Sequence, residues 1–179
     1  MQRITTLTVN TATGQAQTQL TALKKAMGAE INLFGAIANS SSALEGFLNF
    51  KGSLEKGVLS KKLSEQLALT IAGTNGCHYC ASAHAFIGGK LGLSEAEIRA
   101  NLNARSEDSQ TNTILSFARQ VIEQKGRVTT KQLAATEAAG FNREQLVEVI
   151  AHIALNTFTN YFNEAFEIDI DFPKISLTE

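Results

Sequence analysis

The sequence predicts an all-α protein, and three observations lead to that prediction. The chain of 179 residues contains a single proline, Pro173. Proline breaks helices more strongly than any other residue, so residues 1–172 are free to form helices. Apolar residues recur at helical spacing, for example Leu63, Leu67 and Ile71 at intervals of four. Segments that alternate with a period of two are scarce, and the best of them, residues 168–172, is short and acidic.

Capping residues and glycines divide the chain into nine expected helices. Ser, Thr, Asp and Asn favour helix starts, and glycine tolerates the left-handed dihedrals of a helix end. In chain order the helices are 15–27, before Gly28; 30–39; 42–56, before Gly57; 61–74, between Ser60 and Gly76; 77–91, before Gly92; 95–103, after a capping box of Ser94 and Glu97; 109–125, before Gly126; 130–139, before Gly140; and 143–166, after Asn142 and Gln145. The last helix is expected to break near Asn156.

The composition indicates what kind of protein this is and which partners it is expected to bind. With 19.2 kDa, 44% hydrophobic and 18% charged residues, residues 1–179 fit a single globular domain whose core needs no disulfide or metal. The net charge of -1 and the absence of long like-charge runs argue against nucleic-acid binding. The chain shows no secretory signal pattern and no apolar stretch of about 18 residues, so we expect no membrane partner and a cytoplasmic location.

A short internal echo suggests two degenerate repeats. Residues 65–72 and 144–151 share the pattern Glu-Gln-Leu-x-x-x-Ile-Ala at an offset of 79 positions. At that offset Cys77, Cys80 and His84 align with Asn156, Thr159 and Asn163. Either one helical unit was duplicated and only its first copy kept the reactive residues, or the match arose by chance.

Both cysteines lie in the stretch Asn75-Gly-Cys77-His-Tyr-Cys80-Ala-Ser-Ala-His84. A disulfide between them would close so short a loop that it would stabilise the fold very little. In a reducing cytosol a Cys-x-x-Cys pair indicates redox chemistry or metal binding instead. A helix turns by about 100° per residue, so positions 77, 80 and 84 share one face.

The expected helix start at Cys77 gives the two thiols different chemical roles. The positive end of a helix dipole lowers thiol pKa values and raises the thiolate fraction. His84 lies one turn beyond Cys80 and is positioned to exchange its proton, so Cys80 is the expected nucleophile. Cys77 would resolve an oxidised Cys80 into a disulfide. Glu65, on the preceding helix, would orient His84 if the two helices form a hairpin.

Metal binding is the main alternative for this motif. Cys77, Cys80 and His84 offer three zinc ligands, with His152 or His78 as a fourth, but a structural zinc site usually draws on a second Cys or His pair. Haem attachment needs a histidine where Ala81 stands, and iron–sulfur clusters normally take four cysteines. We therefore expect no metal and no cofactor, with His152 a hydrogen-bonded core residue and His78 outside the reactive face.

The pattern of Glu65, Ile71-Ala, Asn75-x-Cys77-x-Tyr79-Cys80 and His84 resembles the core motif of the AhpD-like alkylhydroperoxidases in the carboxymuconolactone decarboxylase superfamily. The core motif spans about residues 58–92, and weaker likeness to peroxidase-related members extends the resemblance over about 30–175. It implies an AhpD-like helical bundle, assembly into a homo-oligomer (trimer or hexamer), and peroxide reduction. Carried over by position, Cys80 forms the sulfenic acid, Cys77 is proton donor and resolving thiol, His84 is the base and Glu65 its relay partner.

One position departs from that family pattern. AhpD proteins of the alkylhydroperoxide reductase system carry histidine where this chain has Tyr79, so the full proton relay and a dihydrolipoyl-protein reductant are not implied. The leading hypothesis is an antioxidant thiol peroxidase that reduces alkyl hydroperoxides or hydrogen peroxide, with an unidentified thiol or dithiol reductant. The alternatives are a thiol–disulfide oxidoreductase or redox sensor with little peroxidase turnover, and a non-enzymatic metal-binding or oligomeric scaffold.

Overall fold

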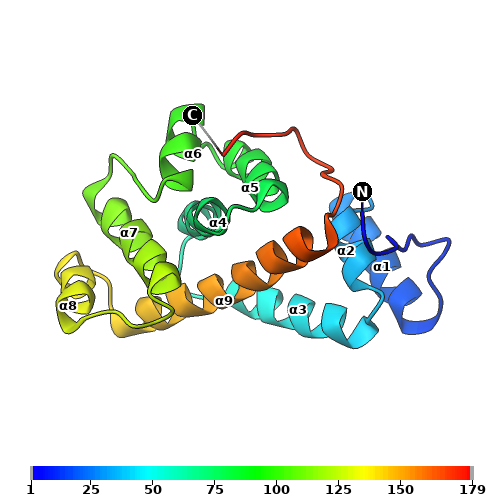
Figure 1. The fold of residues 1–179 in the computed structure, drawn as a ribbon. Helices are drawn as coiled ribbons and strands as arrows, with labels where there is room; N and C mark the ends of the chain where they lie inside the picture. Colours follow the sequence, from blue (N-terminus) through cyan, green and yellow to red (C-terminus); the bar gives the residue numbers. More distant parts are fainter. Residues whose placement is uncertain (1, 178–179) are drawn as a thin grey trace.

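The computed structural model describes residues 2–177, and these form nine α-helices and no β-strand, which confirms the all-α prediction (Figure 1). The helices are α1 (Gly14–Met27), α2 (Asn32–Ile37), α3 (Ser41–Leu54), α4 (Lys61–Asn75), α5 (His78–Lys90), α6 (Glu95–Leu102), α7 (Ser109–Glu123), α8 (Thr130–Ala138) and α9 (Arg143–Phe166). Residues 168–172, the best strand candidate, have no regular secondary structure.

Helix α4 is the central element of the fold. Figure 1 views it end-on, with α5, α6, α7 and α9 around it. Seven consecutive residues of α4, from Gln66 to Ala72, are buried, as expected for a helix that is covered on all sides. Its Leu69 and Ala72 join the hydrophobic core shared with α1, α2 and α5, while Leu67 and Ile71 join the core under α7 and α9. Because α4 packs against both cores, it holds Glu65, one of its residues, in a defined position.

The longest helix, α9, runs without a break from Arg143 to Phe166, so the expected break near Asn156 was wrong. The Asn156 side-chain amide donates to the carbonyl of His152, four residues back and 2.9 Å away, and so stays compatible with helix. Residues 65–84 form two helices joined at Gly76, whereas residues 144–163 lie in one helix. The two copies of the echo, residues 65–72 and 144–151, are thus both helical, and the difference lies in the residues that follow them.

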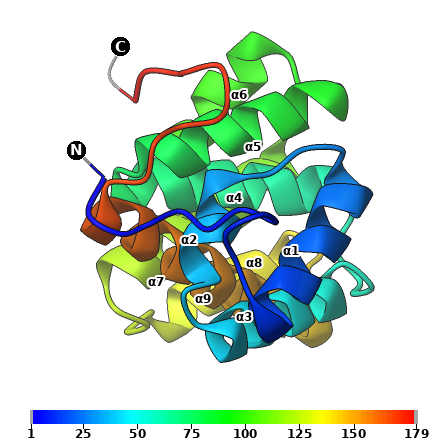
Figure 2. The same ribbon diagram turned by 90° about the vertical axis from the view of Figure 1, so that its right-hand side faces the viewer.

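The C-terminal segment, residues 168–177, returns across the N-terminus of α2 and along α5 (Figures 1 and 2). The backbone N–H of Asn32 donates to Asp171 Oδ2 at 3.0 Å, and that of Ile175 donates to Ser82 Oγ at 3.2 Å. The side chains of Ile168, Ile170, Phe172 and Ile175 pack against the core of α1, α2 and α5. The end of the chain thus covers the helix that carries the cysteines.

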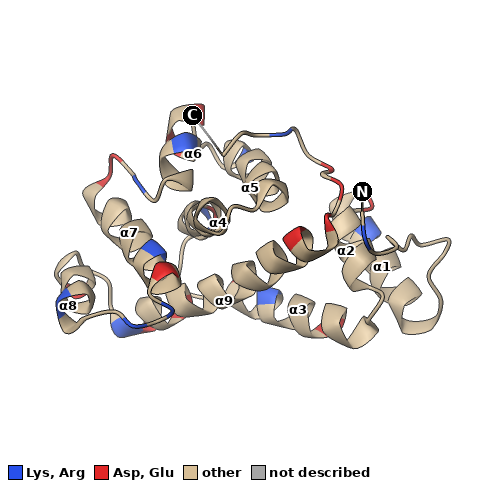
Figure 3. Ribbon diagram, in the orientation of Figure 1, with Lys and Arg blue, Asp and Glu red and all other residues tan. Residues whose placement is uncertain are grey.

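Charges are dispersed over the surface. Figure 3 shows acidic and basic residues interspersed over the outer helices and loops. Within residues 2–177, none of the helices has the length and apolar character that spanning a bilayer requires.

Candidate functional site

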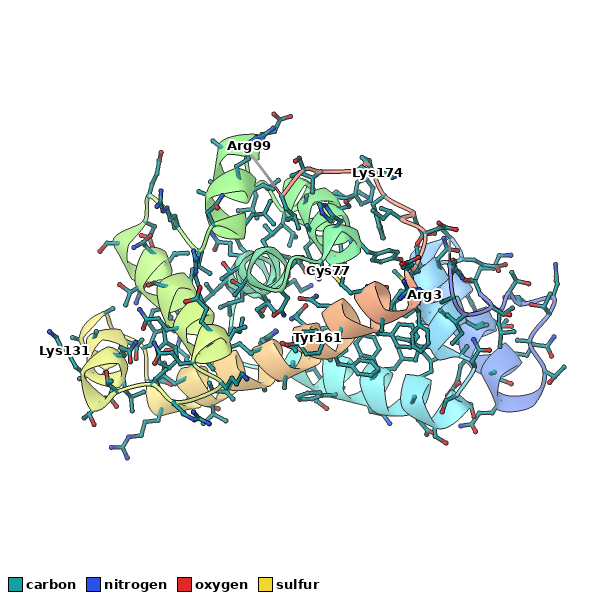
Figure 4. The ribbon with its side chains drawn as sticks, in the orientation of Figure 1. Arg3, Cys77, Arg99, Lys131, Tyr161 and Lys174 are labelled. Atoms are coloured by element: carbon teal, nitrogen blue, oxygen red, sulfur yellow. The ribbon has the colours of Figure 1, made fainter. Side chains whose placement is uncertain are left out.

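The two cysteines lie at the start of α5, where the sequence analysis placed them. Gly76 ends α4 with a left-handed φ of 73°, which reverses the chain, and Cys77 is the N-cap of α5. The Cys77 sulfur accepts a hydrogen bond from the backbone N–H of Cys80 at 3.4 Å. Both thiols are free and buried, with Cys77 0% and Cys80 3% exposed. Figure 4 shows Cys77 between α5 and α9.

Helix α9 supplies polar partners to Cys80 that the sequence analysis missed. Asn163 Nδ2 donates to Cys80 Sγ at 3.1 Å, and the Cys80 thiol donates to Thr159 Oγ1 at 3.9 Å. Both α9 side chains are buried. A signal was present, because Asn156, Asn160 and Asn163 follow helical spacing along one face of the helix. Polar residues on the buried face of a helix need partners, and here the partner includes a thiol.

Glu65 and His84 form the expected pair across the α4–α5 hairpin. His84 Nδ1 lies 2.7 Å from Glu65 Oε2, and both side chains are partly buried. Burial by itself lowers the pKa of His84, but the Glu65 carboxylate outweighs it, so the pKa is raised above its usual value. Glu65 therefore favours the protonated form of His84, whose charge in turn lowers the pKa of Cys80.

The environments of the two thiols push their pKa values apart. The hydrogen bond with Cys77 lowers the pKa of Cys80 despite the opposing effect of burial, and the charge of His84 and the amides of Asn163 and Asn160 act in the same direction. The pKa of Cys77 is raised by its hydrogen bond with Cys80 and by burial. Cys80 is thus the thiolate of the pair, and Cys77 keeps its proton.

A cavity of about 670 Å³ opens beside these groups. Its walls are residues of α3, α4, α5 and α9 at helical spacing, with contributions from α2 and the C-terminal segment. Cys80, His84 and Glu65 line it, whereas Cys77 lies behind Cys80 and outside the lining. A small molecule that enters the cavity therefore meets Cys80 first.

Tyr79, where the family pattern has histidine, anchors the C-terminal segment. Its hydroxyl donates to Asp171 Oδ2 at 2.5 Å and accepts from the backbone N–H of Leu33 at 3.3 Å. Its ring meets Phe172 edge-on, with centroids 5.9 Å apart. Burial and the Asp171 carboxylate raise the pKa of Tyr79, so the phenol stays neutral. It forms part of the cavity wall and carries no charge.

The remaining two histidines lie apart from the sulfur atoms. His78 is exposed, as expected. His152 is buried and lines the cavity, but its Nε2 has no hydrogen-bond partner, in contrast to the expected hydrogen-bonded core histidine. Burial lowers the pKa of His152, which keeps it neutral. Among residues 2–177, no group of three or more His, Cys, Asp or Glu side chains is arranged to hold a metal ion.

Comparisons with known proteins agree with this architecture. A model of the carboxymuconolactone decarboxylase family matches residues 42–124. The fold is similar to that of a peroxidase-related protein with an alkylhydroperoxidase AhpD core from Ralstonia eutropha JMP134 (TM-score 0.83, 19% identity, 95% of this chain and 92% of that one). It is also similar to a peroxidase-related protein from Silicibacter sp. TM1040 (TM-score 0.78, 19% identity, 87% and 84%). A third similar structure is the debrominase Bmp8 (TM-score 0.73, 16% identity, 88% and 86%).

No curated protein sequence matches the chain. The matched residues 42–124 nevertheless include the whole span from Glu65 to His84. The structural similarity extends beyond them to most of the chain. Residues 42–124 thus resemble the carboxymuconolactone decarboxylase family, and the chain has an AhpD-like helical fold.

Proposed function

We propose that the protein is a thiol peroxidase that reduces hydroperoxides through a dithiol–disulfide cycle of Cys77 and Cys80. The observation that carries the proposal is the asymmetry of the two thiols. Cys80 faces the cavity and its thiolate is stabilised, while Cys77 is protonated and lies directly behind it. A peroxidase needs one thiol that meets the oxidant and a second thiol within reach of the first.

The first step oxidises Cys80. Its thiolate attacks the terminal oxygen of the hydroperoxide, so that an S–O bond forms while the O–O bond breaks. The sulfur loses two electrons and becomes a sulfenic acid, and the leaving alkoxide takes a proton from His84 to become an alcohol. Glu65 favours the protonated form of His84 before this step, because its carboxylate raises the histidine pKa.

The second step forms the disulfide, and an external dithiol then reverses it. The Cys77 sulfur attacks the sulfenic sulfur of Cys80, the S–O bond breaks, and the hydroxyl leaves with the Cys77 proton as water. An external dithiol reduces the Cys77–Cys80 disulfide and becomes a disulfide itself. The Cys80 thiol returns its proton to His84, so the cycle converts a hydroperoxide and a dithiol into an alcohol, water and a disulfide.

Substitution of each cysteine in turn tests the mechanism. With cumene hydroperoxide and dithiothreitol, we expect Cys80→Ser to abolish turnover. Without dithiothreitol, Cys77→Ser should consume one equivalent of peroxide and stop as a sulfenic acid that dimedone labels. Normal turnover by the Cys80→Ser variant would refute the proposal.

The burial of both sulfurs favours a small oxidant over a protein disulfide. Cys77 and Cys80 lie beneath α9 and the C-terminal segment, so a second protein has no direct access to either sulfur. Because one similar structure is a debrominase, the fold alone does not select the oxidant. Stopped-flow oxidation by a hydroperoxide and by a protein disulfide separates the alternatives: faster oxidation by the disulfide would favour a thiol–disulfide exchanger.

We also propose that the protein acts in the cytoplasm as a homo-oligomer, a trimer or a hexamer. The outer face of α9 leaves large apolar side chains in solvent, including Val147 at 69% and Tyr161 at 61% exposed. Apolar surface of this kind commonly marks a protein interface. Light scattering after size-exclusion chromatography should give a mass above that of one chain, and a monomer at all concentrations would contradict this part of the proposal.

A further inference from the structure

The interior of the cavity suits an apolar ligand far larger than hydrogen peroxide. Its volume of about 670 Å³ is in the range of sites for whole organic molecules. The buried part of the lining is largely aliphatic and aromatic, and includes Leu33, Phe34, Leu59, Ala68 and Leu155. Hydrogen peroxide is small and polar and gains nothing from such a surface, whereas each buried methylene of a hydrocarbon chain contributes affinity.

Two polar side chains of α9 at the inner wall, Thr159 and Asn156, already have hydrogen-bond partners, whereas the buried Nε2 of His152 has none within residues 2–177. The Thr159 hydroxyl donates to the carbonyl of Asn156, and the Asn156 amide donates to the carbonyl of His152, both at 2.9 Å. These groups need no partner from a ligand. Next to them, Cys80 is the reactive group that a chain in the cavity would meet.

The rim of the cavity is positively charged. Lys51, Lys56 and Lys61 line it, against a single carboxylate at the rim, Glu55. Lys51 pairs with Glu55, but within residues 2–177 neither Lys56 nor Lys61 takes part in an ion pair. Lys61 is also the first residue of α4, whose first turn contains no acidic residue, so the positive end of that helix dipole adds to the lysine charge. The rim is therefore suited to an anion.

Helix α4 relates the rim to the reactive groups. Lys61, Glu65 and Ala68 lie on one face of it and line the same cavity, so the wall descends from Lys61 to Ala68 over about 10 Å at 1.5 Å per residue. Glu65, the partner of His84, lies one turn below Lys61. An anionic head at the rim would thus place the reacting position several carbons along the chain.

We propose that the cavity binds a long-chain carboxylate, with the hydrocarbon chain inside and the carboxylate at Lys56 and Lys61. Resting on the proposed peroxidase function, this makes the substrate class a fatty-acid hydroperoxide with the peroxide within the chain. The chemistry at sulfur is the cycle already described: the peroxide is reduced to a hydroxy fatty acid, and the external dithiol supplies the two electrons.

Binding is tested without catalysis, using the Cys80→Ser variant of the 179-residue chain and saturated fatty acids below their micelle concentration. Each methylene contributes about 0.8 kcal/mol, so affinity should rise about fourfold per carbon until the cavity is filled. A methyl ester should bind more weakly than its acid, and salt should narrow the difference. Absence of binding, or equal binding of acid and ester, would overturn the proposal.

Neighbouring lysines provide a matched control. Lys61→Gln and Lys56→Gln should each weaken binding of the acid by up to about fivefold, the range of exposed ion pairs, and leave the ester unchanged. Lys62→Gln is the control, because Lys62 is adjacent to Lys61 but pairs with Glu97 on another side of α4 and lies outside the cavity lining. An equal loss in the Lys62→Gln and Lys61→Gln variants would contradict the assigned rim.

Turnover separates this inference from the proposed function. For the wild-type protein, kcat/KM should be higher for a fatty-acid hydroperoxide than for its methyl ester, and Lys61→Gln should reduce that ratio, whereas the control Lys62→Gln should not. Turnover of cumene hydroperoxide without binding of any fatty acid would refute the inference and leave the peroxidase intact. Binding of fatty acids without turnover of any hydroperoxide would refute the peroxidase and leave the binding site.

Discussion

The hydrogen bond from Asn163 to Cys80 offers a direct test of how the reactive thiolate is produced. Asn163 Nδ2 lies 3.1 Å from Cys80 Sγ, and the two residues are 2% and 3% exposed. Asn163→Leu removes the donor while nearly preserving the size of the side chain. We expect the pKa of Cys80 to rise, because the thiolate loses a charge-assisted hydrogen bond.

The size of the effect follows from the burial of both groups. A hydrogen bond to a charged group contributes about 1.5–3 kcal/mol, and burial at this site prevents solvent from weakening it. One pKa unit corresponds to about 1.4 kcal/mol, so the pKa of Cys80 should rise by about 1–2 units. Below that pKa, the thiolate fraction and the rate of sulfenic-acid formation should fall by about 10- to 100-fold.

The assay is the pH dependence of Cys80 alkylation by iodoacetamide in a Cys77→Ser background, which leaves one thiol. Asn156→Leu is the matched control, because Asn156 is another buried amide of α9 but donates to the carbonyl of His152. The control should leave the Cys80 pKa unchanged. No shift in the Asn163→Leu variant, or equal shifts in both variants, would refute the assignment.

Three further predictions concern the same hairpin. Glu65→Gln should lower the pKa of His84 in an NMR titration, because the Glu65 carboxylate raises that pKa in the folded state. The stabilisation that this pair provides is lost as the pH rises through the folded-state pKa of His84. The free energies of unfolding of the variant and the wild type, measured with urea, should therefore converge above that pH. Gly73→Ala should destabilise the fold by about 1–3 kcal/mol, because a Cβ there would lie 2.0 Å from the backbone carbonyl oxygen of Leu102 in α6. Gly89→Ala is the control: a Cβ there meets no atom within 4 Å, so the substitution should stabilise the helix by about 0.5–1 kcal/mol. Cys77→Ala should be about 1 kcal/mol less stable than Cys77→Ser in the same assay, because serine is also an N-cap; equal stabilities would show that the cap contributes nothing.

Local signals were sufficient to predict most of the fold. Caps such as Ser60 and Ser94 and the glycine at 76 act within one helical turn, and the structure places helix ends at these positions. The break expected near Asn156 failed because an asparagine side chain can bond to its own helix, which local sequence does not reveal. Alternation at residues 168–172 reflects burial against the core of α1, α2 and α5 and not pairing with another strand.

The residues of the site also fall into two groups: those that local sequence predicted and those that depend on long-range packing. Cys77, Cys80 and His84 are close in sequence, and Glu65 joins them through a hairpin, so helical periodicity was enough to bring them together. Asn163 lies 83 positions from Cys80, and its role depends on how α9 packs against α5. Tyr79 was noted only as a departure from the family pattern. Its bond to Asp171, 92 positions away, depends on the path of the C-terminal segment, which periodicity does not predict.

The N-cap role of Cys77 couples the redox state of the protein to the start of α5. In the reduced protein its sulfur accepts the Cys80 N–H, a contact that a disulfide between the two residues would weaken. A cap contributes about 1 kcal/mol, and stabilising the reduced form of a dithiol by that amount raises its reduction potential by about 20 mV. In the proposed cycle, the helix start would therefore shift the equilibrium between disulfide and dithiol about fivefold towards the dithiol.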